Sequence, residues 1–317
     1  MTHRAICQAV CLSLLLAGRA SGQDSLKPGE GYLQVPGGRV WYRIVGSGTH
    51  TPLLVLHGGR GAGSYYLAPL AALADERPVI FYDRLGVGHS DPPPDTSVWR
   101  LDRAVDELQR VRTALGLHDI YLYGHSWGTI LAVEYLLTRP TGVHGVILAG
   151  PALSATRARR DLAALRATLP DSVQRVLRQH ERDGTCDAPE YRAAVVESQR
   201  IWFARRRPLS VESESSFAAS ARSESLFREM GGRPCATFGA LPSYDRTDRL
   251  PEIRVPTLFT AGRYELPTME TIRLYQSRIP GSQVVILEHS GHITMQDEPE
   301  ENVRVIRQFL NGLERPR

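Results

Sequence analysis

Four short, largely apolar runs divide the first half of the chain. They are Leu53–Leu56, Val79–Tyr82, Ile120–Tyr123 and Val143–Leu148. Strands that are apolar on both faces are typical of a parallel sheet with helices on both sides. The stretches between the runs are helix-like, roughly over residues 64–74, 101–115 and 129–137. This alternation predicts a βαβ series and therefore an α/β fold with a mostly parallel, doubly wound sheet.

The pattern changes on both sides of this series. Pro36-Gly37-Gly38 separates Tyr32–Val35 from Arg39–Val45, which predicts a β-hairpin before the first buried strand. From about Ser154 to Arg249 the chain is arginine-rich and helix-like, without a strong strand signal. The alternation of strand and helix then resumes over residues 257–260, 269–278, 284–287 and 299–313.

The simplest interpretation is one α/β domain with a helical insertion. We expect residues 23–153 and 248–317 to form the core, and residues 154–247 to form a helical cap. Open α/β sheets bind ligands at the carboxyl ends of their strands, so a segment that covers those ends would act as a lid.

The N-terminus has the pattern of a secretory signal peptide. Met1–Arg4 carries a positive charge, Ala5–Leu16 is apolar, and Ala20-Ser21-Gly22 is a small-residue cleavage pattern. A membrane anchor is the alternative, but the apolar run is short and Gln8 interrupts it. We therefore expect residues 1–22 to be removed, and the mature chain to be exported to the periplasm or the extracellular space.

Composition and charge narrow the classes of protein further. Hydrophobic residues make up 42% of the chain, which is a globular composition. No apolar run reaches the ~18–20 residues of a membrane span, so none is expected in the mature chain. The formal net charge of +4, from 38 basic and 34 acidic residues, is weak and scattered and does not favour nucleic-acid binding. The run Arg205-Arg206-Arg207 is predicted to be a solvated face.

Two cysteines remain once residues 1–22 are removed. They are Cys186 and Cys235, and both lie in the predicted insertion. In an oxidising compartment such a pair can form a disulfide, whereas the alternative is two unrelated buried thiols. We favour the bridge because the two cysteines share one segment.

A candidate nucleophile lies in Gly124-His125-Ser126-Trp127-Gly128, which has the pattern G-x-S-x-G. The motif follows an apolar run and opens a helical stretch. In that context the glycines permit a sharp turn that presents the serine hydroxyl, and the N–H of the next residue points beside it. The alternative is a Gly-Ser turn that caps a helix. We expect Ser126 to be the nucleophile.

A serine nucleophile needs a base, and the base needs an acid that fixes its tautomer. His292 follows the last predicted strand, where this fold carries its base, and His289 is the competing candidate. Glu265 follows the strand 257–260 and is the predicted acid. The alternative for Glu265 is a loop charge, with Glu288 and Asp297 as the other candidate acids.

The oxyanion of an acyl-transfer reaction needs two N–H donors. Trp127 can supply one, and Gly59, at the end of His57-Gly58-Gly59, can supply the other. The glycines of this stretch do not form a phosphate loop, because no Gly-Lys-Ser/Thr follows them. No spacing of histidine, cysteine and aspartate suggests a metal site, so neither a cofactor nor a metal is expected.

Several segments together resemble the proline iminopeptidase family of α/β-hydrolases. They are His57–Gly61, Tyr82–Asp91, Gly124–Gly128, Asp245–Asp248, Pro256–Tyr264 and the Gly291-His292 turn. The resemblance spans nearly all of the mature chain and is weakest in the insertion. It implies a helical cap from about Ser154 to Asp245, Ser126 as nucleophile, His292 as base, and release of an N-terminal residue, often proline, from small peptides.

The chain departs from this family's pattern at three places. Arg60 replaces a usual proline, and Glu265 replaces the usual aspartate of the triad. The family places a glutamate in the cap, where it binds the free amine of the substrate, but the matching stretch Met230–Phe238 contains no acid. A buried ammonium without a carboxylate partner is unfavourable. The acids that could substitute from elsewhere in the cap are Glu197, Glu212, Glu214 and Glu224.

Three functions are consistent with these observations. The first is an exported serine hydrolase of proline-iminopeptidase type that acts on small peptides. The second keeps the chemistry but acts on an ester or another small acyl substrate, because the cap carboxylate is missing. The third is a non-catalytic binding protein on a hydrolase fold, which the complete set of Ser126, Glu265 and His292 disfavours.

Overall fold

The computed structural model describes residues 26–59, 62–93, 95–219 and 241–314. The predicted signal peptide, Arg60, Glu224 and the stretch Met230–Phe238 lie outside these ranges. So does Cys235. Its predicted partner Cys186 is buried and disulfide-bonded, so the pairing of the two remains a prediction.

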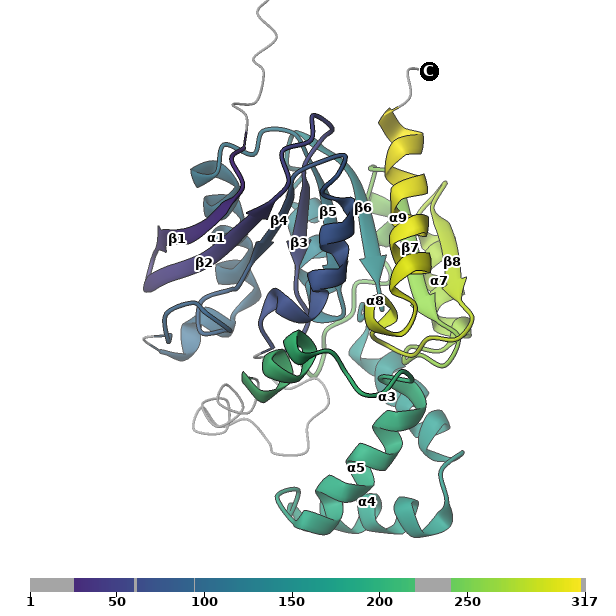
Figure 1. The fold of residues 1–317 in the computed structure, drawn as a ribbon. Helices are drawn as coiled ribbons and strands as arrows, with labels where there is room; N and C mark the ends of the chain where they lie inside the picture. The colour runs from purple at the N-terminus through teal and green to yellow at the C-terminus, as the bar shows by residue number, and fades with distance from the viewer. Residues whose placement is uncertain (1–25, 60–61, 94, 220–240, 315–317) are drawn as a thin grey trace, which may run out of the picture.

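One eight-stranded sheet forms the centre of the molecule (Figure 1). Its order is β1-β2-β4-β3-β5-β6-β7-β8, in which β2 pairs antiparallel with β1 and β4 and every other pair is parallel. The strands are β1 Gly29–Val35, β2 Gly38–Val45, β3 Leu53–Leu56, β4 Val79–Tyr82, β5 Ile120–His125, β6 Val143–Ala149, β7 Thr257–Gly262 and β8 Gln283–Leu287. The predicted mostly parallel α/β sheet is confirmed, and the predicted hairpin is its β1–β2 edge.

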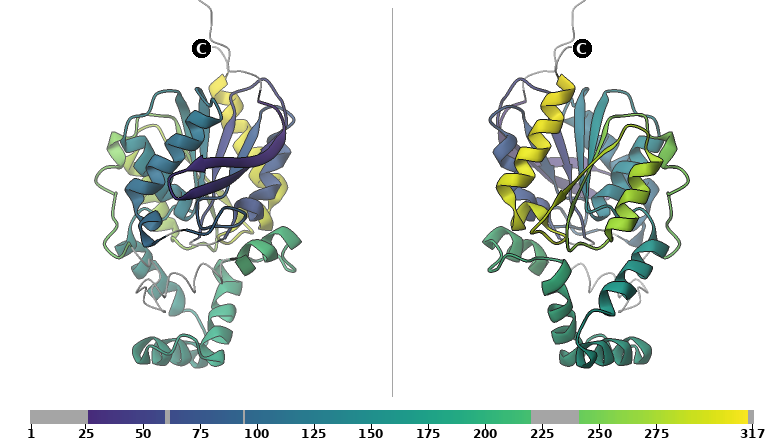
Figure 2. Two further views of the ribbon diagram at one scale, coloured as in Figure 1. Left: turned by 90° about the vertical axis from the view of Figure 1, so that its left-hand side faces the viewer. Right: turned by 90° about the vertical axis from the view of Figure 1, so that its right-hand side faces the viewer.

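Helices cover both faces of the sheet, as the two side views show (Figure 2). One face packs against α1 (Leu101–Ala114), α2 (Trp127–Leu137) and α7 (Met269–Arg278), and the other against the 3₁₀ helix η1 (Ser64–Leu73) and α9 (Pro299–Glu314). Every residue of β3, β4 and β5 is buried. A strand that is covered on both sides must be apolar along its whole length, which explains the continuous runs in the sequence.

The helices between β6 and β7 lie beyond the end of the sheet toward which the arrow of β6 points (Figure 1). They include α3 Ala155–Arg166, α4 Asp171–Asp183, α5 Pro189–Trp202 and the helical residues 211–219. The two ends of this segment meet, since Ser154 pairs with Asp245 in an isolated β-bridge and its hydroxyl donates to the Asp245 carboxylate at 2.6 Å. The segment therefore leaves and rejoins the core at one point. A small apolar cluster of α4 and α5, around Leu177 and Ala194, holds the outer helices together.

The structure differs from the expected elements in two places that bear on the site. The stretch predicted to be helical over 64–74 is a 3₁₀ helix rather than an α-helix, with Pro69 inside it, where proline removes an N–H donor. A short helix α8 (Thr294–Asp297), which the sequence did not predict, follows His292 directly. Within the described ranges, no helix combines the length and the apolarity that crossing a membrane requires.

Candidate active site

Ser126 occupies a strained turn between β5 and α2. Its φ of 54° and ψ of −117° lie outside the regions that residues with a side chain normally adopt. Its N–H donates to Ala149 at the end of β6, and its carbonyl accepts from the N–H and the hydroxyl of Thr129. Trp127 is the first residue of α2, so its N–H has no acceptor within that helix.

The glycine after this turn is required by close packing. A β-carbon on Gly128 would lie 2.2 Å from the carbonyl oxygen of Leu56, at the end of the neighbouring strand β3. Only a residue without a side chain lets α2 approach β3 so closely. The motif thus brings the serine turn against the loop that follows β3.

Glu265 and His292 form a buried pair next to this turn. Oε1 of Glu265 lies 2.6 Å from Nδ1 of His292, and Oε2 accepts the N–H of Gly262 at 2.9 Å. Burial lowers the pKa of His292 to about 4, so the imidazole is neutral at pH 7. Burial raises the pKa of Glu265, and the N–H of Gly262 opposes that shift. With its proton on Nδ1, the imidazole has Nε2 available as an acceptor.

Gly150, directly after β6, makes room for this pair. Its φ is +56°, and a β-carbon there would lie 2.6 Å from Oε1 of Glu265 and 3.0 Å from the His292 ring. An acid at this position is one way to build such a site, and the sequence has none there. Here the carboxylate reaches the same space from the loop after β7.

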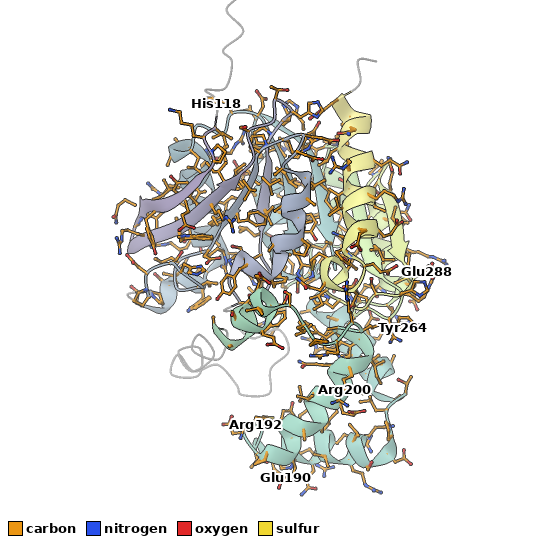
Figure 3. The ribbon with its side chains drawn as sticks, viewed as in Figure 1. His118, Glu190, Arg192, Arg200, Tyr264 and Glu288 are labelled. Atoms are coloured by element: carbon orange, nitrogen blue, oxygen red, sulfur yellow. The ribbon has the colours of Figure 1, made fainter. Side chains whose placement is uncertain are left out.

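The competing candidates lie elsewhere. His289 is exposed. Glu288 is exposed and paired with Arg263 at 2.5 Å, on the outer side of the β7–β8 edge near Tyr264 (Figure 3). The Asp297 carboxylate accepts backbone N–H groups from Arg205, Arg206 and Gly291. Neither Glu288 nor Asp297 forms a hydrogen bond with the side chain of His292 among the described residues.

The loop that carries His292 is joined to the end of the inserted helices. The N–H of His292 donates to Trp202 at 2.7 Å, and the N–H of Ile293 donates to Phe203 at 3.0 Å. Oδ1 of Asp297 binds the next residues of the inserted segment, while Oδ2 binds the His292 loop. We call the three hydrogen bonds that Asp297 accepts, from Arg205, Arg206 and Gly291, the Asp297 latch.

The predicted oxyanion loop packs against Ser126, the predicted nucleophile. A β-carbon on Gly58 would lie 2.8 Å from the β-carbon of Ser126, so the two backbones are in direct contact. Gly59 has a φ of +70° and lines the same cavity as Ser126, Trp127 and His292. The structure thus brings Ser126, His292 and the glycine loop to one cavity, and Glu265 binds His292 from outside the cavity wall.

Tyr66 and His125 connect these parts, and sequence analysis assigned neither a role. The N–H of Gly58 donates to the Tyr66 hydroxyl at 2.8 Å, and that hydroxyl lies 2.6 Å from Nδ1 of His125. Nε2 of His125 lies 2.9 Å from the carbonyl oxygen of His292. When His125 is neutral and carries its proton on Nε2, every donor and acceptor in this hydrogen-bond network has a partner. Burial accordingly lowers the pKa of His125 to about 3.

This hydrogen-bond network predicts that the folded protein loses stability as the pH becomes acidic. The folded pKa of His125 lies below the unfolded value near 6.5, so its contribution to stability is complete above pH 6.5 and is lost as the pH falls toward the folded pKa. At pH 5 the loss is about 2 kcal/mol relative to pH 7.5. A His125→Gln variant stays neutral at both pH values. We therefore expect its free energy of unfolding, measured in urea, to fall between pH 7.5 and pH 5 by about 2 kcal/mol less than that of the unsubstituted protein.

The comparison of variants is needed because other buried groups titrate in the same interval. Burial raises the pKa of Glu107 to about 7 and also raises that of Glu265, so both carboxyls add stability as the pH falls. The exposed His289→Gln is the matched control and should keep the pH dependence of the unsubstituted protein. If His125→Gln loses as much stability between pH 7.5 and pH 5 as the unsubstituted protein does, the assignment of a neutral His125 in the folded protein is contradicted.

The cavity has a volume of about 720 Å³ and lies between the serine turn and the inserted helices. Its wall is mostly apolar and includes the aromatic residues Trp99, Trp127, Trp202, Phe203 and Phe217. No aspartate or glutamate of the described residues lines it, whereas Arg84 and Arg207 do. Arg205, Arg206 and Arg207 are all exposed, as expected for a solvated face, but Arg207 also reaches the cavity.

Three of the four cap acids that could replace the missing amine-binding carboxylate lie in the described residues, and none of the three lines this cavity. Glu197 is exposed on α5 and pairs with Arg200, which lies on the outside of the inserted helices (Figure 3). Glu212 and Glu214 are exposed and are absent from the cavity wall. Glu224 lies outside the described residues.

The fold and this arrangement of residues define an α/β hydrolase. The family described as the alpha/beta hydrolase fold matches residues 51–299. The proline iminopeptidase of Heyndrickxia coagulans is 42% identical, over 90% of this chain and 99% of that protein, and the one of Saccharolobus solfataricus is 32% identical, over 90% and 94%. The crystal structure of the proline iminopeptidase of Mycobacterium smegmatis superposes with a TM-score of 0.82 at 30% identity, over 90% of this chain and 98% of that chain. The chain belongs to the proline iminopeptidase family of α/β-hydrolases, and it is a hydrolase.

Proposed function

We propose that this protein is an exported serine exopeptidase that releases N-terminal residues, preferably proline, from small peptides through an acyl-enzyme. The observation that carries the chemistry is the buried Glu265–His292 pair, whose histidine lines one cavity with Ser126 on a strained turn. The apolar and aromatic side chains of the cavity wall suit a small apolar ring such as that of proline. The similarity of the chain to the proline iminopeptidases of Heyndrickxia coagulans and Saccharolobus solfataricus supports the choice of substrate.

The proposed reaction begins with attack of the Ser126 hydroxyl on the carbonyl carbon of the N-terminal residue. Nε2 of His292 accepts the hydroxyl proton, and Glu265 holds the imidazole by the Nδ1 hydrogen bond and stabilises the imidazolium. The oxyanion accepts hydrogen bonds from the N–H groups of Gly59 and Trp127. Collapse of the tetrahedral intermediate passes the proton from His292 to the leaving amine. Water then hydrolyses the ester on Ser126 by the same steps.

A second function is favoured by one observation. The described cavity wall contains no carboxylate for a substrate ammonium, and burying an ammonium without a partner is unfavourable. An esterase, or another acyl hydrolase, would need no such carboxylate. The catalytic groups would be the same.

Hydrolysis of prolyl-β-naphthylamide and of its N-acetylated form separates the two functions. Cleavage of the free-amine form alone is the expected result for an exopeptidase. Cleavage of both forms, or of the acetylated form alone, would contradict a requirement for the amine. Cleavage of neither amide together with cleavage of a p-nitrophenyl ester would support the esterase. Ser126→Ala serves as the blank in every assay.

Export rests on the predicted signal peptide at residues 1–22. When the full chain is expressed in a secreting host, we expect protein outside the cytoplasm whose N-terminal residue is Gln23. Recovery of only the uncleaved chain inside the cytoplasm would contradict export.

A further inference from the structure

Arg84 is a buried cation on the wall of the catalytic cavity, and the proposed reaction gives it no role. It follows β4, and only 4% of its surface is exposed. Its N–H donates to Nε2 of His57, in the residue before the oxyanion glycines. Its guanidinium carbon lies 3.8 Å from the centre of the Trp127 ring. The backbone of Arg84 therefore contacts the predicted oxyanion loop at His57, and its guanidinium packs on the side chain of Trp127.

The guanidinium of Arg84 has no hydrogen-bond partner among the described residues. Its Nε is buried without an acceptor, and no side-chain acceptor or ion pair within 4.0 Å joins it. Stacking on Trp127 uses the face of the guanidinium and leaves the N–H groups, which lie in its plane, available at the edge. The two Nη groups also have no hydrogen-bond partner among the described residues. Unlike Nε they are not fully buried, so they are the donors that a ligand in the cavity can reach.

Glu107 is the carboxylate whose charge acts most strongly on the pKa of Arg84. Its charge opposes the lowering of the Arg84 pKa by burial, so the two interact, but no salt bridge forms between them. Oε2 of Glu107 accepts the N–H of Leu85, and Oε1 is buried without a partner. The alternative role of Arg84 is therefore to balance Glu107 from inside the protein, and the experiment below distinguishes the two roles.

We propose that Arg84 binds the free C-terminal carboxylate of a short peptide in this cavity. A carboxylate is the planar anion that a guanidinium binds through two parallel hydrogen bonds, and no carboxylate of the described wall competes for it. This inference rests on the proposed exopeptidase function. There the N-terminal residue brings an amine to the site, so an anion in the substrate must lie on the leaving side of the scissile bond. Di- and tripeptides place their C-terminal carboxylate within one or two residues of that bond.

The test compares peptides that differ only in this carboxylate. The kcat/KM values of prolyl-alanine and prolyl-alanyl-alanine are measured against those of the same peptides with a C-terminal amide. We expect the free acid to be preferred about tenfold or more at one of the two lengths, and Arg84→Met to reduce this ratio to about one. Because both substrates are measured on one preparation, a partly unfolded variant does not alter the ratio.

Arg207→Met is the matched control, because Arg207 is the other arginine on the described cavity wall. It should retain the preference. Loss of the preference in Arg207→Met but not in Arg84→Met would overturn the assignment. So would a ratio near one at both lengths in the unsubstituted protein, or an unchanged ratio in Arg84→Met, which would leave Arg84 as the partner of Glu107.

A binding measurement covers the case in which Arg84→Met does not fold. Calorimetry on Ser126→Ala should give a dissociation constant for the free acid about tenfold below that of the amide at the same length. Equal constants would overturn the inference. If the unsubstituted protein cleaves none of the four peptides, the exopeptidase function itself has failed, whereas cleavage without a preference rejects only the role of Arg84.

Discussion

A Ser126→Ala variant is expected to lose at least about 10⁴-fold in kcat on any substrate that the protein hydrolyses. The attacking oxygen is removed, while the cavity, Gly59 and the His292 pair are left in place. The variant should also fail to react with a fluorophosphonate probe that labels the unsubstituted protein. Its urea unfolding midpoint should not change, because no hydrogen bond of the Ser126 hydroxyl within the described residues is lost.

A Ser126→Gly variant tests the same loss of activity and, in addition, the backbone strain at position 126. The backbone at position 126 has a φ of 54°, which glycine adopts without strain. Relief of that strain is about 1–3 kcal/mol, and the greater freedom of glycine in the unfolded chain offsets about 0.5–1 kcal/mol of it. We therefore expect an inactive protein with a higher unfolding midpoint. Retained activity in either variant would exclude Ser126 as the nucleophile.

Glu265→Gln is expected to lower kcat by about 10³–10⁴-fold at neutral pH. The N–H of Gly262 needs an acceptor, so the amide oxygen takes the place of Oε2. The amide nitrogen then faces Nδ1 of His292, which must become an acceptor. The imidazole proton moves to Nε2, where it prevents the base from accepting the serine proton.

Stability and two further variants check this account. Glutamine has the same shape and no charge to bury, so the unfolding midpoint should stay equal or rise. Glu265→Asp, which restores the family's usual acid, should keep more activity than Glu265→Gln. Glu288→Gln removes an exposed acid that pairs with Arg263 and should stay within about twofold of full activity. A Glu265→Gln variant with more than a tenth of the activity would exclude Glu265 as the partner of the base.

Much of this fold could be predicted from the sequence because its strands are covered on both sides. Burial forces continuous apolar runs, as in Leu53–Leu56 and Val79–Tyr82, and such runs locate strands without any knowledge of their partners. Parallel strands gather their carboxyl ends at one edge, so Ser126 and His292 could be predicted to meet although they lie far apart in the chain.

The contacts that the sequence did not predict depend on packing between distant segments. Tyr66 and His125 are 59 positions apart, and nothing near Tyr66 in the sequence indicates that its hydroxyl reaches an imidazole. Asp297 has the residue type and the region of a candidate acid, but its carboxylate turns to the inserted segment instead. Arg84 lies in a segment that carries the family resemblance, and its unused donors are visible only once its surroundings are known.

The Asp297 latch restricts how the inserted helices can move. Trp202 and Phe203 accept hydrogen bonds from His292 and Ile293, and the latch fastens the next residues of the insertion to the same loop. Any displacement of the insertion at this corner therefore also displaces the imidazole from Ser126. Substrate and product must pass on a side of the cavity away from this corner while the site is active. Under the proposed mechanism, an open form in which the insertion moves away from Asp297 would also move His292 away from Ser126 and would therefore be inactive while water enters the cavity from that side.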